Sequence, residues 1–592
     1  MIKKFNEKGL CGYAFNAVSD SRWFHPLLLL VWVAIGAGLR FSHLASKAPW
    51  TDEFATIVFS LGHSFRTVPL DRVLTLDVLL QPLQNTPPAG IGDVMHHLMA
   101  ESTHPPVYFL LAHLWMGLFP TEGGLASIWA ARSLPALFGV ASIPAIFGLS
   151  CLAFRSRLAG QMAAAMMAVS PFGIFLAQDA RHYTLATLLV IASVCCLIIA
   201  TRAVHHRTLL PLWVGLAWVA INTLGVATHY FFTLTLCTEA LVLIVQGVRL
   251  RCWKKRTWLQ SHWWRIYLVA VGTLTGGLVW LPFWRSSYGS ELTKWIYDGE
   301  INWLEPIGRF LAWVITMLVS LPMETTTLPS ALVFASGLVT VIFLLWTLPI
   351  LNRGIKIQSS QLDNRLSVQV LREFVLGTLV LFSILTYGLG ADLTLAPRYN
   401  FLYFPVVIAL IGASLATYWH PTPAVQTEPF RPLRRGGKKA VMLIWLMGLM
   451  GGLTVVGNLG YLQNNRSDLL VNVIQKVSHS PVLIATTHKH HGQTGRMMGL
   501  AWQFQGIERS GSSAGGTPPQ FLLAHKAQGA ETPKNPTTTL QEAVAGLPKP
   551  LDVWLVDFRA GVELQQQNCF ADSQFLPKLN GYKYKLYHCE PK

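Results

Sequence analysis

Residues 24–41 read FHPLLLLVWVAIGAGLRF, and the acidic motif Trp50-Thr-Asp52-Glu53 follows shortly after them. An α-helix needs about 20 predominantly apolar residues to cross a hydrocarbon core of about 30 Å. The stretch therefore predicts a first transmembrane helix, with two carboxylates just outside the membrane. Similar apolar runs recur along most of the chain, and their number decides the class of protein.

Apolar residues dominate the composition. Of 592 residues, 52% are hydrophobic and 13% are charged, whereas soluble domains carry about 25% charged residues. Two short apolar stretches, Pro105 to Phe119 and Pro306 to Leu321, are ambiguous. Clear candidate spans lie at about 24–42, 133–153, 158–176, 184–201, 208–226, 231–247, 266–284, 330–351, 373–390, 399–418 and 440–460. We predict an all-α polytopic membrane protein with about 11 transmembrane helices, or 13 if both ambiguous stretches span.

The distribution of basic residues predicts the orientation. Clusters of Lys and Arg lie in short loops at 155–157, 202–207, 249–256, 353–372 and 431–439, and the opposite loops carry isolated basic residues, chiefly Arg181, Arg285, Lys294 and Arg398. Basic loops favour the cytoplasmic side. In a bacterial-type plasma (inner) membrane, 11 spans then place the N-terminus inside and the C-terminus outside. The net charge of +17 follows this pattern and does not indicate a nucleic acid partner.

This topology divides the chain into two parts. Residues 1–460 form the transmembrane catalytic domain, and residues 42–131 within it form a long external loop with helices expected at 52–65, 71–83 and 91–100. Residues 461–592 form an extracytoplasmic α/β domain, with strands expected at 481–485, 520–524, 553–556 and 582–587, a helix at 495–504, and loops at 510–518 and 532–539. Outside the cytoplasm, Cys569 and Cys589 can form a disulfide, and the sequence leaves open whether they do.

Polar residues suited to chemistry collect at the outer ends of the predicted spans. Carboxylates, cations and aromatic rings on one face are the groups needed to bind an anionic lipid phosphate and to activate a hydroxyl acceptor. The motifs are Trp50-Thr-Asp52-Glu53, Thr103-His104, Arg132, Gln178-Asp179-Ala-Arg181-His-Tyr183, Thr228-His229-Tyr230 and Pro397-Arg398-Tyr399.

Each charged group also has a purely structural explanation. Asp52 and Glu53 either complement a helix N-terminus or supply Asp52 as a general base. Asp179 either pairs with a neighbouring arginine or acts as a second acid, orienting the acceptor or binding a divalent cation with the first two. The arginines either snorkel or clamp a donor phosphate, to which the guanidinium is suited; they are Arg132, Arg181 and Arg398.

The remaining candidates are rings and a histidine-rich segment. His104, Tyr183, His229, Tyr230 and Tyr399 are candidates for substrate binding, although a lone interfacial histidine is also common as a structural hydrogen-bonding residue. The segment 488–491 is predicted to be a solvated loop, with a metal site as the alternative. No nucleotide-binding glycine motif and no serine nucleophile motif occurs. No acidic residue is expected to be buried in the middle of a span, as it would be in a proton-coupled transporter.

The order and spacing of the motifs over residues 24–400 resemble the GT-C superfamily, in particular its branch of protein O-mannosyltransferases and the lipid A aminoarabinose transferase. The long external loop and the external tail are also similar to that branch. Besides the acidic motif, the resemblance rests on His104-Pro-Pro-Val-Tyr108 with Leu114-Trp-Met-Gly-Leu-Phe119, Ala131-Arg132-Ser-Leu-Pro135, Ser170-Pro171, Gln178-Asp-Ala-Arg181-His-Tyr183 and Pro397-Arg398-Tyr399.

The resemblance implies an inverting glycosyltransferase that moves a sugar from a polyprenyl-phosphate donor to a lipid, glycan or protein acceptor on the extracytoplasmic face. Asp52 then matches the catalytic acidic residue, Glu53 supports it or touches the acceptor, and Arg132 and Arg398 are candidates for the donor phosphate. Metal dependence does not transfer, so a divalent cation stays an open expectation. The alternatives are a transporter or flippase of lipid-linked sugars, and a non-catalytic sensor or scaffold.

Overall fold

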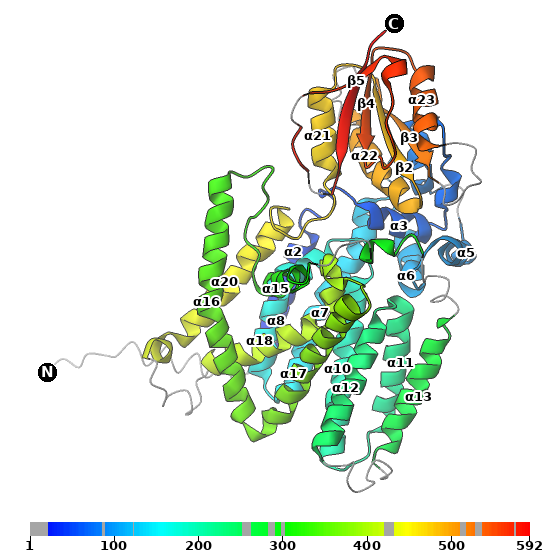
Figure 1. Cartoon of the computed structure of the whole chain (residues 1–592). Coiled ribbons are helices and arrows are strands. Elements are labelled where there is room, and N and C mark those ends of the chain that lie inside the picture. The colour runs from blue at the N-terminus through cyan, green and yellow to red at the C-terminus, as the bar shows by residue number, and fades with distance from the viewer. Residues whose placement is uncertain are drawn as a thin grey trace, which may run out of the picture.

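The computed structural model describes residues 22–85, 89–121, 123–250, 262–281, 290–297, 302–419, 431–509, 517–526, 535–573, 576–579 and 581–591. A large helical bundle carries a smaller layer of sheet and helices at one end (Figure 1). Three expectations fall outside the described residues: the basic cluster at 251–256, Arg285, and the loop at 510–516.

A helix lies at each of the predicted spans. Within the described ranges, seven helices are long and apolar enough to cross a membrane, or eight if the bent pair α8 and α9 counts as one span. The prediction of a helical polytopic membrane protein is confirmed at this level, while the number 11 stays a prediction. The helices are α2 (Phe24–Phe41), α7 (Ile128–Phe154), α8 (Arg157–Val169), α9 (Pro171–Ala177), α10 (Tyr183–His205), α11 (Leu212–Thr228), α12 (Phe232–Arg249), α13 (Trp264–Leu278), α16 (Ser330–Ser360), α17 (Leu362–Ser383), α18 (Phe404–Trp419) and α20 (Arg431–Val456).

The two ambiguous stretches form short helices. Helix α6 spans Val107–Met116 and α15 spans Glu305–Leu318. At about 1.5 Å per residue they reach roughly 15 and 21 Å, which is well below the hydrocarbon thickness of about 30 Å. Their lengths therefore favour the topology in which neither of them spans.

The bend between α8 and α9 has an identifiable cause. The two helices meet at 58°, and Pro171 begins the second one, so the peptide nitrogen there cannot continue the ladder of α8. The buried Arg40 of α2 donates hydrogen bonds to the carbonyl oxygens of Met167 (2.9 Å) and Ala168 (3.0 Å). Its guanidinium thus satisfies carbonyl groups that the end of α8 leaves without intrahelical partners.

An acidic residue is buried inside the bundle, contrary to the expectation from the sequence. Glu239 of α12 is 3% exposed. Its carboxylate accepts hydrogen bonds from Ser193 Oγ (2.5 Å), Trp218 Nε1 (3.2 Å) and Asn222 Nδ2 (3.4 Å). The sequence-based expectation was wrong because the three donors come from α10 and α11, and no pattern within α12 reveals them.

The smaller layer is a six-stranded sheet in the order β1-β3-β2-β4-β6-β5. The central strands β3 (Gln520–His525), β2 (Val482–His488) and β4 (Leu551–Val556) run parallel, and β6 (Tyr584–Cys589) and β5 (Cys569–Ala571) follow antiparallel. Helices α21 (Ser467–Val477), α22 (His491–Arg509) and α23 (Pro536–Gly546) accompany the strands. The predicted α/β fold of this segment is confirmed.

Two local expectations were wrong. Residues 532–539 were expected to be a loop, but α23 begins at Pro536, because Asn535 caps it by accepting a hydrogen bond from Thr537 N and proline suits a first helical turn. The expected helix at 71–83 is interrupted by strand β1 (Val73–Leu74), and only α4 (Leu76–Leu80) and the 3-10 turn η2 (Gln81–Leu83) are helical.

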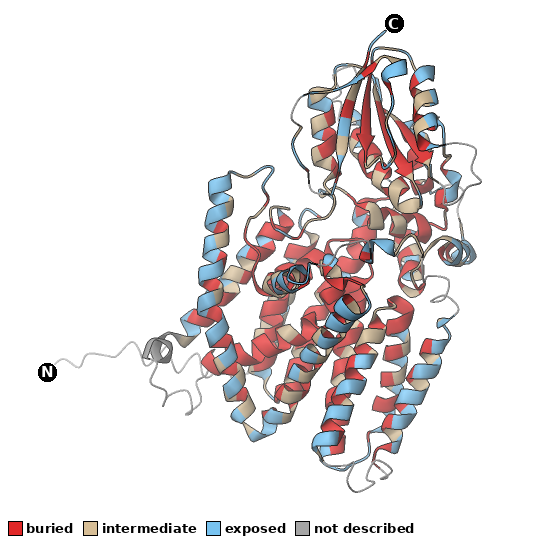
Figure 2. Ribbon diagram, viewed as in Figure 1, coloured by how far each residue is buried: buried red, intermediate tan, exposed pale blue. Residues whose placement is uncertain are grey.

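The segment between α2 and α7 and the C-terminal segment share one structure. Strand β1 pairs antiparallel with β3, with Val73 opposite Leu522. Helix α3 (Thr51–Ser60) packs against α22, and Phe54 and Ile57 belong to the same buried cluster as Met497 and Ala501. Figure 2 shows this junction as a continuous buried region. The division of the chain at residue 460 stays a prediction, but the sheet draws its edge strand from the preceding part.

The disulfide that the sequence left open is present. Cys569 and Cys589 are bonded and lie opposite each other on β5 and β6. The bridge ties the last strand of the chain to the sheet edge, as expected for a segment outside the cytoplasm.

Helices α8 and α18 approach so closely that one position has room for glycine only. A Cβ atom built at Gly412 of α18 would lie 2.5 Å from Ala163 N and 2.6 Å from Ala163 Cα, both in the backbone of α8. Small residues at such a contact let two helix backbones come together.

We expect Gly412→Ala to lower the free energy of unfolding by about 1–3 kcal/mol, because the added methyl group forces the two helices apart. Gly148→Ala is the matched control, because a Cβ at Gly148 on α7 meets nothing within 4 Å. Thermal unfolding of both variants in detergent micelles measures the difference. Equal melting temperatures for the two variants would contradict this account of the contact.

Candidate functional site

The first turn of α3 presents two adjacent carboxylates in different surroundings. Glu53 is fully buried, and its Oε2 accepts a hydrogen bond from the backbone nitrogen of Trp50 (3.3 Å), which closes the start of the helix. The side chain of Asp52 is 29% exposed. Successive helical residues point about 100° apart, so burial of one carboxylate leaves the other directed toward solvent.

Glu53 is held by Arg132 of α7. Arg132 Nε and Nη2 each donate to one carboxylate oxygen of Glu53 at 2.7 Å, and the backbone nitrogen of Ala180 donates to Oε1 at 2.7 Å. Arg132 Nη1 donates to the carbonyl oxygens of Leu44 (2.8 Å) and Lys47 (2.9 Å). This pair therefore joins α3, α7 and the segments before α3 and α10.

Asp52 lies between two other arginines. Its Oδ2 is 4.0 Å from Arg181 Nη2 and 3.4 Å from Arg398 Nη2. Arg181 is buried and also donates to Asp52 O (3.0 Å) and Thr56 Oγ1 (2.9 Å). The Nε atoms of Arg181 and Arg398 are buried and have no hydrogen-bond partner within the part of the chain that is described. An exposed carboxylate thus faces two guanidinium groups that retain unused donors.

Aromatic rings surround Arg398. Its guanidinium carbon lies 5.0 Å from the ring centre of Trp50, 5.7 Å from that of Trp295 and 5.5 Å from that of Tyr399. Such cation–π contacts hold the side chain in one position. Burial raises the pKa of the Tyr399 hydroxyl, so this ring stays neutral.

Three histidines form a neutral cluster behind the arginines. His182 lies between His104 and His229, with ring centres 5.5 and 4.6 Å away, and Tyr183 lies beside His229 at 5.5 Å. Burial lowers the pKa of all three imidazoles, that of His229 to about 3. A neutral His104 accepts a hydrogen bond at Nε2 from Arg181 Nη2 (2.8 Å). The positive charge beside Asp52 therefore resides on the arginines.

Asp179 is close to the site but does not pair with its neighbour Arg181. It is 7% exposed and accepts hydrogen bonds at both carboxylate oxygens from Asn464 Nδ2, at 3.1 and 3.0 Å. Burial, together with the nearby Glu53 carboxylate, raises its pKa to about 7. Burial lowers the pKa of Lys47 to about 8, and Lys47 Nζ donates to Gln178 Oε1 at 2.6 Å.

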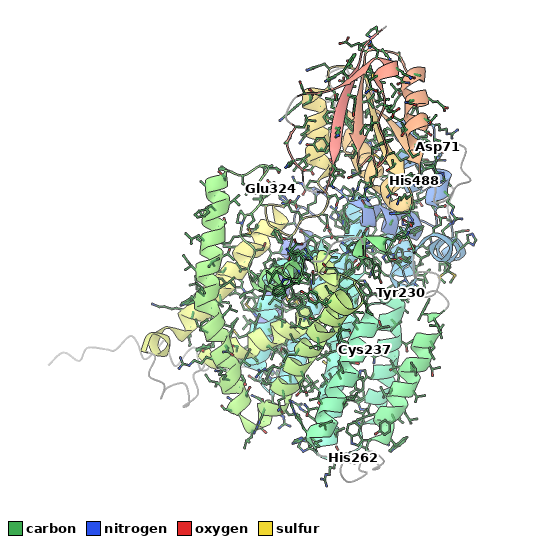
Figure 3. All side chains as sticks on the ribbon, viewed as in Figure 1. Asp71, Tyr230, Cys237, His262, Glu324 and His488 are labelled. Atoms are coloured by element: carbon green, nitrogen blue, oxygen red, sulfur yellow. A yellow bond between two sulfur atoms is a disulfide. The ribbon has the colours of Figure 1, made fainter. Side chains whose placement is uncertain are left out.

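The structure thus brings together most residues that the sequence selected. Tyr230 lies in the turn between α11 and α12, next to His229 and half-buried (Figure 3), where burial raises its pKa to about 12. Among the described residues, no group of three or more His, Cys, Asp or Glu side chains is placed to hold a metal ion. The divalent cation therefore remains an expectation for which no ligand set can be named, and the segment 488–491 forms the end of β2 and the start of α22.

Sequence reasoning missed three residues at the site. His182 stands between two selected residues, Arg181 and Tyr183, and that adjacency was the available signal. Lys47 has no local signal. Asn464 contacts Asp179 across 285 residues of sequence, so a single sequence could not connect them.

No protein-family model and no curated protein matches the chain. The chain is similar to the solved structure of ArnT from Cupriavidus metallidurans bound to undecaprenyl phosphate, with 14% identity and a TM-score of 0.47 over 90% of this chain and 93% of that one. The apo structure of that protein is 12% identical to this chain, with a TM-score of 0.45 over 99% of this chain and 100% of that one. The chain is also similar to the oligosaccharyltransferase AglB from Archaeoglobus fulgidus in complex with an inhibitory peptide and a dolichol-phosphate. The identity is 11% and the TM-score is 0.42, over 81% of this chain and 64% of that one.

These structures are GT-C membrane glycosyltransferases. With TM-scores below 0.5, the likeness assigns no role to any residue of this chain.

Loss of the buried pair should destabilise the protein. In Glu53→Gln the guanidinium of Arg132 stays buried without a carboxylate, which typically costs about 3–5 kcal/mol. Glu305→Gln is the control, because Glu305 is 58% exposed and pairs with Arg309 on the surface, where a pair contributes about 0–1 kcal/mol. Thermal unfolding in micelles should show a large loss for the first variant alone. Similar losses in both would show that burial of the pair is unimportant.

The raised pKa of Asp179 makes stability depend on pH. Its pKa rises from 3.8 in the unfolded chain to about 7 in the folded one, so its contribution is complete below about pH 4 and is lost as the pH rises through about 7. Asp179→Asn removes this dependence. Between about pH 5 and 7.5, below the pKa of Lys47, the melting temperature of the wild type should fall relative to that of the variant. The control Asp77→Asn, at an exposed position of the first loop, should follow the wild type. Parallel curves for Asp179→Asn and the wild type would refute the raised pKa.

Proposed function

We propose that the chain is an inverting glycosyltransferase that moves a sugar from a polyprenyl-phosphate donor to a hydroxyl or amine acceptor at the extracytoplasmic face of a bacterial-type inner membrane. The observation that supports this function is the placement of Asp52. Its carboxylate is partly exposed at the junction of the helical bundle and the sheet layer, 3.4 Å from Arg398 and 4.0 Å from Arg181. The sequence motifs that resemble the GT-C superfamily converge on this place.

Asp52 is assigned the role of general base. Its carboxylate takes the proton of the acceptor as the acceptor oxygen or nitrogen forms a bond to the anomeric carbon of the donor sugar. The bond from that carbon to the phosphate oxygen breaks on the opposite face, and its electron pair leaves with the phosphate. Proton transfer by a positioned side chain typically contributes a factor of about 10²–10⁴ to the rate.

The leaving phosphate is assigned to Arg181 and Arg398. Both guanidinium groups have an Nε atom without a partner among the described residues, and both already face the carboxylate. Charge pairing in a partly buried site is stronger than in water. Arg132 directs its donors to Glu53 and to backbone carbonyls. We therefore assign Arg132 and Glu53 to positioning α3, in place of the phosphate contact predicted for Arg132.

The tyrosine and histidine rings beside the arginines are assigned to substrate contact. Tyr399 lies against Arg398, and the neutral imidazoles of His104 and His229 lie behind Arg181 with Tyr183. Tyr230 follows directly on His229. Neutral rings offer hydrogen bonds and apolar surface to a sugar without competing with the arginines for the phosphate. Asp179 is assigned to orienting the acceptor, since a carboxyl group can hydrogen-bond a hydroxyl or amine.

The positions of the basic residues support the proposed orientation of the bundle in the membrane. Arg155, Arg202 and Arg249 follow or end helices α7, α10 and α12, whose first turns lie toward the site. All three contact residues in the first half of α17, namely Asp363, Ser367 and Glu373. These basic positions are thus gathered at the end of the bundle away from the sheet, as the positive-inside rule requires for a cytoplasmic face.

A transporter or flippase of lipid-linked sugars is the second candidate. The buried Glu239, with its donors from α10 and α11, is the observation that favours it, because an acidic residue inside a membrane bundle commonly marks a transport pathway. Its carboxylate is, however, occupied by three hydrogen bonds within the bundle.

The deciding experiment measures transfer of radiolabelled sugar from a panel of polyprenyl-phosphate sugars to endogenous acceptors in membranes. Asp52→Asn should lower the rate by about 10²-fold or more, because the base is removed while the size of the side chain is kept. Asp77→Asn, exposed in the same external loop, is the matched control and should behave as the wild type. Full activity of Asp52→Asn would refute the assignment of the base. Movement of labelled lipid across the bilayer by both Asp52 forms, without any transfer, would favour the transporter.

A further inference from the structure

Trp295 is an exposed aromatic ring at the site that the proposed mechanism does not use. It lies in the 3-10 turn η5 (Lys294–Ile296), drawn in green beside α3 in Figure 1, and is 37% exposed. Arg398 lies against the indole at 5.7 Å, and the Tyr399 ring is stacked with it at 6.5 Å and 24°, while part of the indole stays exposed. The chain thus offers a flat apolar surface directly beside the arginine that contacts Asp52.

The backbone that carries this ring is anchored. Ile296 is buried, and its carbonyl oxygen accepts a hydrogen bond from Asp392 N (3.0 Å). Asp392 is in turn bound by Arg309 Nη2 at 2.5 Å. Since Asp392 also opens the segment that leads to Arg398, the ring and the guanidinium rest on the same support. A ring held in this way loses little conformational freedom when a ligand stacks on it.

Hydrogen-bonding groups stand next to the ring. Glu291 lies four residues before Trp295 in the chain and is bound by Lys294. Lys489 of the C-terminal segment approaches the other carboxylate oxygen of Glu291 at 3.9 Å, and its side chain is 37% exposed. The segment around η5 therefore contacts both Arg398 in the site and Lys489 in the sheet layer. The turn that carries the exposed indole thus also carries a carboxylate and an ammonium group, and a second ammonium group reaches that carboxylate from the C-terminal segment. Such a set of groups suits a sugar ring, which has an apolar face and a rim of hydroxyl groups.

We propose that Trp295 is the platform on which a sugar ring stacks in this site, with Glu291 and Lys489 hydrogen-bonding its hydroxyl groups. The ring belongs either to the donor or to a glycan acceptor, because both meet beside Asp52. The inference rests on the proposed function for the nature of the ligand. It assigns sugar recognition to a segment outside the motifs that carry the phosphate and proton chemistry, and it gives the C-terminal segment a direct part in binding.

The test is equilibrium binding to the purified full-length protein in micelles. The probes are undecaprenyl phosphate alone and a panel of undecaprenyl-phosphate hexoses and pentoses. The wild type should bind at least one glycosylated carrier more tightly than the bare carrier. Trp295→Ala should lower the ratio of the two affinities by about tenfold, a typical upper value for aromatic stacking. Loss of the contact between Trp295 and Arg398 weakens both carriers alike and leaves this ratio unaffected. Trp295→Phe should retain most of the advantage. Trp303→Ala is the matched control, since Trp303 is 66% exposed.

The outcomes separate this inference from the proposed function. Unchanged sugar-dependent binding in Trp295→Ala, with unchanged affinity for glycan acceptors, would overturn the inference while transfer by the wild type still stood. Equal weakening for bare and glycosylated carriers would also overturn it, because that pattern indicates a loss of structure. Weaker affinity for a glycan acceptor alone would assign the stacked ring to the acceptor. If the wild type shows sugar-dependent binding that Trp295→Ala loses, but transfers no sugar, the platform would stand and the transferase would be refuted.

Discussion

The buried pair of Glu53 and Arg132 determines the geometry of the site. It fixes the first turn of α3 to α7, and the third hydrogen bond from Ala180 fixes the loop that carries Asp179 and Arg181. Because neighbouring helical residues point about 100° apart, holding Glu53 inside forces Asp52 outward between two arginines. Removing both members of such a pair is often tolerated, but removing one is costly. Of the two acids in the motif, Glu53 therefore has a structural role, and Asp52 is the one that we propose for the chemistry.

The site contains two kinds of polar group, namely arginines that carry a permanent charge and histidines that are neutral. The histidines that surround Arg181 are held neutral by burial, so they neither repel the guanidinium groups nor bind the phosphate. The net charge next to Asp52 then depends on two arginines, which stay ionised at any accessible pH. Asp179 and Lys47, whose pKa values burial moves to about 7 and about 8, are the groups near the site whose charge varies under physiological conditions.

The sequence predicted what depends on local composition and missed what depends on distant partners. Apolar runs located the helices, and alternation located four strands of the sheet. The binding partner of Arg132 could not be predicted. An arginine at the start of a helix can bind a ligand, or it can bind a carboxylate such as that of Glu53, which is 79 positions away. Strand β1 has two residues and exists through its pairing with β3. Glu239 lies in the middle of the predicted span 231–247, but the donors that hold its carboxylate come from α10 and α11 and could not be identified from the sequence. No sequence motif around Trp295 indicated that this residue belongs to the site.

The pairing of β1 with β3 has a consequence for biosynthesis. Helix α3 carries Asp52, yet its apolar face is covered by α22, and its loop is tied to β3 through Val73 and through the hydrogen bond from Asp71 N to Leu523 O. These partners emerge from the ribosome only after every membrane helix has been made. Contacts of such long sequence separation form late. The surroundings of the carboxylate that we propose as the base are thus completed as one of the last steps of folding, so a chain that stops short of the sheet would lack the contacts that hold α3 in place.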